Sequence, residues 1–115
     1  MIYRNYYGMD GDTVVGPLTM DEWLEQFGRH QGGHLTSRVA ADELPGNLTV
    51  STVFLCIDHN WGFRDPRLVL FETMVFGGEH DEYQRRWHTR AQAIAGHDQI
   101  VAALRAGHDP DESVP

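Results

Sequence analysis

Two apolar segments in the centre of the chain constrain the fold more than any other feature. They cover residues 48–57 and 68–76, and a polar loop of ten residues separates them. Both segments are rich in β-branched and aromatic residues, and both faces of each are largely apolar. This pattern is typical of strands in the middle of a sheet that is covered on at least one side. The chain therefore contains the core of a small sheet domain.

A β-hairpin is predicted at the N-terminal end. The dipeptide Asp10-Gly11 is a hairpin turn signal. Residues 2–7 are aromatic-rich and are expected to pair with residues 13–15, because both segments have strand-like composition. Gly16-Pro17 follows directly and is expected to stop the pairing.

Two capping boxes predict two helices. In a capping box, the side chain of each of two residues at a helix start accepts a hydrogen bond from the backbone amide of the other. The string TMDE at 19–22 opens a short helix over residues 20–27, which Gly28 is expected to end. The string TRAQ at 89–92 opens a longer helix that runs to about residue 106. The first helix is expected to bury Met20, Trp23, Leu24 and Phe27. The apolar stripe of the second contains Ala93, Ile94, His97, Ile100, Val101 and Leu104.

The predicted fold class is α+β, as a single domain over residues 1–107. Further strands at 35–41 and 83–88 bring the antiparallel sheet to four or five strands, and the two arginines of 83–88 suit a sheet edge. The C-terminal helix is expected to pack on one face, while the short helix closes an end. Residues 108–115 are an acidic tail that is expected to be frayed.

Composition restricts the function classes. The net charge is −8 with histidines neutral, which disfavours a nonspecific nucleic-acid binder and suits an uncharged or basic partner, or imitation of an acidic surface. The single cysteine, Cys56, excludes a disulfide within the chain and a Cys-based zinc cluster. No apolar run reaches the length of a membrane span and no signal-peptide pattern is present, so a cytoplasmic location is expected. No cofactor motif is found.

Glu72 is the most unusual residue of the central segments, because it is a carboxylate inside the apolar string LFETMVF. Counting by twos places it on one face with the apolar side chains Leu68, Leu70, Met74 and Phe76. If the C-terminal helix covers that face, the carboxylate needs a partner, and Arg85, Arg86 or His97 could provide one. Register counting places Glu72 opposite Trp87. A structural ion pair is the favoured interpretation, and a general base, a metal ligand or a solvent-facing position are alternatives.

Asp58, His59 and His97 are the other candidates for chemistry. Asp58 and His59 end a predicted strand and could bind a metal, but neighbouring strand residues point to opposite faces. An Asx turn that starts the loop is the favoured alternative. His97 lies within a helix stripe, where a hydrogen-bonded core histidine is more usual than a ligand.

The loop between the central segments contains the best candidates for a recognition surface. These are the aromatic residues Trp61 and Phe63 together with Arg64 and Arg67. Aromatic and arginine side chains contribute most of the energy of many protein interfaces. The alternative is that the aromatic residues pack over the end of the sheet.

The strings STVFL-x-x-DH and LFETMVFGG, with the helix around DEWLEQF and the closing helix TRAQA, resemble a group of small proteins of bacteriophages and mobile elements, often actinobacterial. The group has no assigned function. The resemblance implies a phage accessory protein in the host cytoplasm. We therefore expect a non-enzymatic protein that binds a host or phage protein in a stoichiometric complex. Inhibition of a host system and a homodimer are both compatible with this expectation. The alternatives are a small enzyme or metal-binding domain that uses Glu72 with His59, Asp58 or His97, and a minor assembly protein.

Overall fold

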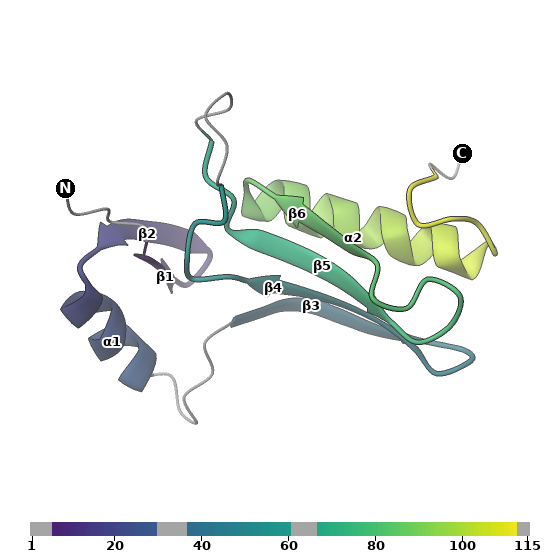
Figure 1. Ribbon diagram of the computed structural model, residues 1–115, viewed down its shortest axis with the longest axis horizontal. Helices are drawn as coiled ribbons and strands as arrows, with labels where there is room; N and C mark the ends of the chain where they lie inside the picture. The colour runs from purple at the N-terminus through teal and green to yellow at the C-terminus, as the bar shows by residue number, and fades with distance from the viewer. Residues whose placement is uncertain (1–5, 30–36, 61–66, 113–115) are drawn as a thin grey trace.

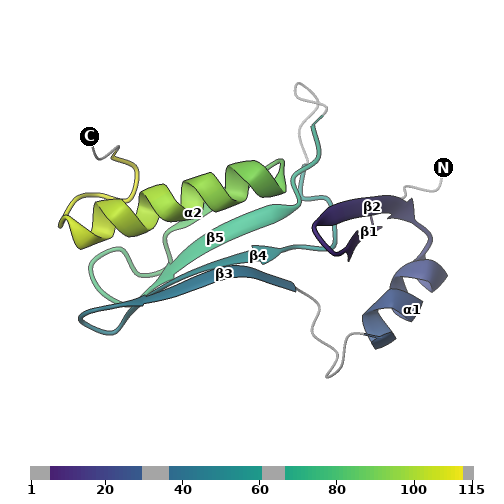
Figure 2. The ribbon, with the colours of Figure 1, turned by 180° about the vertical axis from the view of Figure 1, so that it is seen from behind.

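The computed structural model describes residues 6–29, 37–60 and 67–112. Its elements are β1 (Tyr6–Asp10), β2 (Thr13–Leu18), α1 (Met20–Arg29), β3 (Ser37–Leu44), β4 (Leu48–Phe54), β5 (Phe71–Phe76), β6 (Gln84–Trp87) and α2 (Arg90–Arg105). The predicted α+β class is confirmed. An antiparallel four-stranded sheet has the order β3-β4-β5-β6, so the two central apolar segments form its middle strands. Helix α2 lies along one face of this sheet, while β1, β2 and α1 lie at one end (Figures 1 and 2).

The N-terminal hairpin forms a two-stranded sheet of its own. The turn at Asp10-Gly11 is present as predicted, but the expected stop at Gly16-Pro17 is wrong. A register shift lets β2 continue, and Tyr6 pairs with Leu18. The Tyr7 amide donates to the Cys56 carbonyl at 2.7 Å, which attaches the hairpin to the chain just beyond β4.

Helix α1 begins at the predicted capping box, with Thr19 and Glu22 bonded reciprocally at 3.0 and 3.1 Å. It packs on the hairpin, where the Trp23 and Tyr6 rings lie 5.2 Å apart. The expected burial of the whole stripe is wrong, because Met20 is 54% and Leu24 49% exposed. A two-stranded sheet is too narrow to cover a full helix face. The helix also continues through Gly28 to Arg29, and the side chain of Phe27 lies outside the described part of the structure.

Helix α2 and the larger sheet enclose the core. The helix has the predicted capping box at its start and contacts all four strands of the sheet. Two apolar clusters lie along this interface. One contains Tyr7, Phe54, Leu70, Phe71 and Ala93, and the other contains Leu44, Val50, Val75, Ile100 and Val101. Between them lie the fully buried polar side chains of Thr52, Thr73 and His97.

The strand ends differ from the expected ones by a few residues. β4 ends at Phe54 rather than at residue 57, and Cys56 adopts a left-handed backbone conformation with φ of 65°. The described beginning of the C-terminal tail returns toward the sheet, where Pro110 is buried and the Tyr83 hydroxyl donates a hydrogen bond to Asp111. Burial, followed by this hydrogen bond, raises the pKa of Tyr83 to about 12.

Candidate functional site

A chain of side-chain hydrogen bonds crosses the core beneath α2. The Trp87 indole Nε1 donates to Thr73 Oγ1 at 2.9 Å, and the hydroxyls of Thr73 and Thr52 lie 2.5 Å apart. Thr52 Oγ1 lies 2.7 Å from His97 Nδ1, and His97 Nε2 lies 2.7 Å from Asp42 Oδ2. These five residues come from β3, β4, β5, β6 and α2. This hydrogen-bond chain therefore joins every strand of the larger sheet to α2.

The donor and acceptor properties of the five side chains determine in which direction each of these hydrogen bonds is donated. An ionised Asp42 only accepts hydrogen bonds, so His97 carries a proton on Nε2. With His97 neutral, Nδ1 accepts from the Thr52 hydroxyl, and Thr52 in turn accepts from Thr73. Thr73 accepts from the Trp87 indole, so each donor in the chain has an acceptor. We assign this tautomer to His97, because it satisfies all five groups in the order observed.

The Asp42–His97–Thr52 part of the chain has the order of a hydrolase triad but is closed to substrate. Thr52 is 0% and His97 1% exposed. The Thr52 oxygen also contacts Thr73, so its surroundings are filled by protein. What this arrangement can do is hold α2 against the sheet and fix the orientation of Trp87. Sequence reasoning singled out His97 but missed its partners, although threonines inside two apolar strands were a usable signal.

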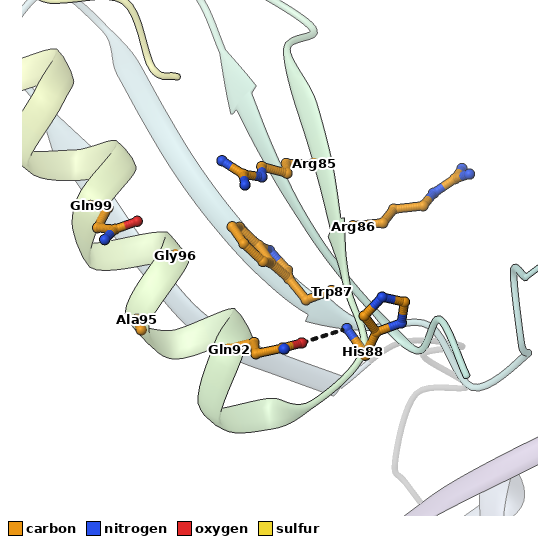
Figure 3. Close-up of a pocket in the computed structure, with 8 residues that line it drawn as sticks. All are labelled: Arg85, Arg86, Trp87, His88, Gln92, Ala95, Gly96 and Gln99. Carbon is orange, nitrogen blue, oxygen red and sulfur yellow. Dashed lines mark hydrogen bonds between the residues drawn. The ribbon is translucent and has the colours of Figure 1, made fainter. Parts of the chain in front are cut away.

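Trp87 is the end of this hydrogen-bond chain that borders a groove on the protein surface. The six-membered ring of its indole lies against Gly96, where an added Cβ would stand 2.1 Å from a ring carbon. The Arg85 guanidinium carbon lies over the indole as well, 4.7 Å from a ring centroid of Trp87. Figure 3 shows Trp87 between Arg85 and the helix. The indole is thus fixed by a hydrogen bond, a close helix contact and a cation–π contact.

The groove between β6 and α2 has a volume of about 360 Å³. It is lined by Arg85, Arg86, Trp87, His88, Gln92, Ala95, Gly96 and Gln99. The chain contains 17 acidic residues, yet none of the residues that line this groove is acidic. Arg85 is therefore the positive side chain on the α2 side of the groove, whereas the Arg86 guanidinium is paired with Glu72 on the opposite face of the sheet. Sequence reasoning assigned these arginines to a sheet edge, but the groove depends on the distant helix.

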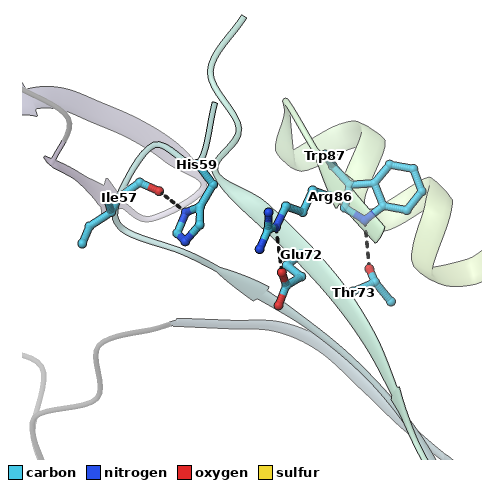
Figure 4. Close-up of polar contacts among 6 residues, drawn as sticks. All are labelled: Ile57, His59, Glu72, Thr73, Arg86 and Trp87. Atoms are coloured by element: carbon cyan, nitrogen blue, oxygen red, sulfur yellow. Dashed lines mark hydrogen bonds and ion pairs between the residues drawn. The ribbon is translucent and has the colours of Figure 1, made fainter. Parts of the chain in front are cut away.

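Glu72 lies on the sheet face opposite α2. Its neighbour Thr73 faces the helix, and successive strand residues point to opposite faces. Glu72 pairs in register with Arg86, whereas Trp87 pairs with Phe71, so the predicted register was wrong by one residue. The carboxylate accepts from Arg86 Nε at 2.9 Å, with the Glu72 side chain 12% exposed and that of Arg86 40% exposed. Figure 4 shows this ion pair and the Thr73–Trp87 bond pointing in different directions from β5.

Asp58 and His59 form the base of the loop. Asp58 Oδ1 accepts from the amides of Asn60 and Val69 at 2.9 and 2.8 Å, which is an Asx turn with a second bond across the loop base. The His59 Nδ1–H donates to the Ile57 carbonyl at 2.7 Å (Figure 4). Within residues 6–29, 37–60 and 67–112, no group of three potential metal ligands is found. Glu72 and His97 lie on opposite sheet faces and cannot share a site.

The predicted recognition loop is described only in part. Trp61, Phe63 and Arg64 lie outside the described residues, so their role stays a prediction. Arg67 is exposed, and its carbonyl accepts from the Asn60 side chain at 2.5 Å. The base of the loop is therefore held by Asp58 and Asn60.

Cys56 is not an activated thiol. Burial raises its pKa from 9.0 to about 11, so the thiol stays protonated at neutral pH. This environment is that of a packed cysteine, and it gives no support to a redox role.

None of the protein families, curated proteins or solved structures with which the chain was compared matches it. The described helices include none with the length and apolar character needed to cross a bilayer.

Proposed function

We propose that this chain is a non-enzymatic binding protein that acts by stoichiometric contact with another protein, and that the β6–α2 groove is part of its docking surface. The observation that carries this proposal is the groove itself, in which exposed Arg85 lies over a fixed tryptophan and no lining residue is acidic, on a chain of net charge −8. Arginine and tryptophan are enriched among residues that dominate interface energies. A phage-type accessory protein with a host or phage partner fits this role.

Within the described residues, structural contacts occupy the side chains that the sequence marked as candidates for chemistry, together with Thr52. His97 and Thr52 are buried and hydrogen-bonded to one another, and Asp58 holds two backbone amides. Glu72 is bonded to Arg86. This occupation supports binding over the alternative of a small enzyme, because a catalytic group must reach its substrate.

Affinity capture from a host lysate tests the proposal. Wild type and Arg85→Ala are compared with Arg105→Ala, a control in the last turn of α2 that does not line the groove. We expect one protein to be captured in a 1:1 ratio by wild type and by the control, and to be lost with Arg85→Ala. Equal capture by wild type and both variants would place the interface elsewhere. A stable homo-oligomer in light scattering, with no captured protein, would favour the assembly alternative.

A further inference from the structure

The groove runs beside the edge strand of the larger sheet. Among the strands that the structure describes, β6 pairs with β5 alone, and the Val75 amide donates to the Tyr83 carbonyl at 2.9 Å. Backbone groups alternate in direction along an antiparallel strand, so the amides and carbonyls of Gln84 and Arg86 point outward. The next outward amide, that of His88, donates to the Gln92 side chain at 3.1 Å and closes this end of the edge. Gln84 and Arg86 thus offer a short row of backbone groups suited to an added strand.

Positive side chains flank this edge on both faces. Arg85 lies on the α2 side, over the Trp87 ring, and Arg86 lies on the opposite side, beside Glu72. Figure 3 shows Arg86 extending away from Trp87. A strand added along β6 would place its own alternate side chains next to Arg85 on one face and Arg86 on the other. Acidic side chains on the α2 face of the added strand would complement Arg85, while Arg86 is already paired with Glu72.

Trp87 makes a peptide a better occupant than single-stranded nucleic acid. Aromatic residues that bind nucleic acid do so by stacking on bases. In this structure the Trp87 ring is packed against Gly96 and covered by Arg85, so it does not present a free stacking surface. A peptide can also use the outward backbone groups of Gln84 and Arg86, which a nucleic acid cannot match with a regular ladder.

We propose that the β6–α2 groove binds an extended acidic peptide segment of a partner protein as a fifth strand next to β6. This inference rests on the proposed function and names the chemistry of the partner segment. Backbone bonds to Gln84 and Arg86 supply the register, and Arg85 selects acidic side chains on the α2 face of the added strand. Helix α2, with Gln92 and Gln99, forms the wall of the groove.

A peptide titration tests the inference. The probes are an acetylated octapeptide of alternating Thr and Glu, its Thr/Gln counterpart, and an eight-nucleotide oligothymidine. Each is added to the ¹⁵N-labelled full chain while amide shifts and hydrogen exchange are followed. We expect the acidic peptide to shift and protect the Gln84 and Arg86 amides, and to bind at least ten-fold more tightly than the Gln peptide. Added salt should weaken the complex.

Two variants separate the backbone and charge contributions. Gln84→Pro removes an outward amide at the first residue of an edge strand, a place where proline is tolerated. It should keep the wild-type melting temperature and weaken acidic-peptide binding at least ten-fold. Arg85→Ala should weaken binding by a similar factor, while Arg105→Ala should leave it unchanged.

Each remaining outcome counts against the inference. Equal binding of the two peptides would overturn the acidic selectivity but leave the proposed function intact. Shifts outside the groove, or none at millimolar peptide, would overturn strand addition and would identify Arg85 and Arg86 as charges that merely protect a sheet edge. Tighter binding of oligothymidine than of the acidic peptide in the groove would show that the ligand is a nucleic acid and not a peptide. The lysate capture assumes no partner chemistry, so it decides the proposed function separately.

Discussion

On the sheet face that carries α2, cross-strand pairs of β4 and β5 are completely enclosed, whereas the pairs on the opposite face are partly open. The enclosed pairs are Phe54 with Phe71, Thr52 with Thr73, and Val50 with Val75. The pairs on the open face are Thr49 with Phe76, Ser51 with Met74, and Val53 with Glu72. Each face mixes polar and apolar residues, so composition does not distinguish them. The difference lies in how each face satisfies its polar groups.

Glu72 and Thr73 show this difference between adjacent residues. Thr73 has no charge, is fully buried, and is satisfied by Thr52 and Trp87. Glu72 is charged and is satisfied by a single arginine that remains partly in solvent. The enclosed face should therefore be sensitive to the loss of one hydrogen bond, and the open face should tolerate the loss of a charge.

Replacing Val101 by Asp should have the largest effect. Val101 is 8% exposed in the apolar cluster under α2, so the variant would bury an unpaired charge and should lose about 3 kcal/mol or more in unfolding free energy. Ala102→Asp, at the exposed neighbouring position, is the control and should change little. Urea unfolding measures both. A soluble Val101→Asp protein of unchanged stability would show that α2 does not cover this face.

Gly96→Ala tests the contact between α2 and Trp87. In an unconstrained helix this change would stabilise the protein by up to about 1 kcal/mol. Here the added Cβ meets the indole at 2.1 Å, so the ring must move, and we expect a loss of about 1–3 kcal/mol. Thermal melting gives the sign directly, and a higher melting temperature would contradict the close packing.

Thr52→Val compares the two faces within one strand. It keeps the size of the side chain but removes the donor to His97 Nδ1, which should cost about 1–3 kcal/mol. Ser51→Val, one residue away on the open face, should stay within about 0.5 kcal/mol of wild type. Urea unfolding measures both variants. Equal effects would mean that the hydrogen-bond chain adds no stability. Independently, nitrogen shifts of His97 should show the proton on Nε2.

Glu72→Gln should be mild. The ion pair with Arg86 is partly exposed, so removal of the charge should cost less than about 1 kcal/mol. Melts of wild type and variant, with and without EDTA, measure this. A wild type whose melting temperature falls by several degrees in EDTA, or a variant that gains stability, would favour the metal-site alternative for Glu72.

Stability should also fall at alkaline pH. Folding raises the pKa of Cys56 from 9.0 to about 11 and that of Tyr83 from 10.0 to about 12. The folded state therefore retains protons that the unfolded chain releases, so this stability is complete below pH 9 and declines from there to about pH 12. Cys56→Ala and Tyr83→Phe should each flatten the decline in a pH series of urea melts. An unchanged profile in both variants would assign the decline to other groups.

The sequence allowed the elements with local signals to be predicted. The hairpin turn and both capping boxes were correct, because a few neighbouring residues determine them. The faces of β5 were not predictable, since both faces read as apolar and a slip of one residue exchanges them. Glu72 was consequently paired with the wrong register position. The groove and the Asp42–Trp87 hydrogen-bond chain join residues distant in sequence, so spacing could not reveal them.

The Thr52–Thr73 pair has a consequence for how the chain avoids incorrect pairing. A one-residue slip between β4 and β5 would turn one strand over, while a two-residue slip would keep the faces but set each threonine against a valine or a phenylalanine. In the slipped sheet the buried hydroxyls and His97 would lose their partners in an apolar layer, at a cost of about 1–3 kcal/mol for each group. An entirely aliphatic layer would carry no such penalty. The polar layer thus favours a single alignment of two otherwise similar apolar strands, and it disfavours the shifted pairings from which aggregates grow.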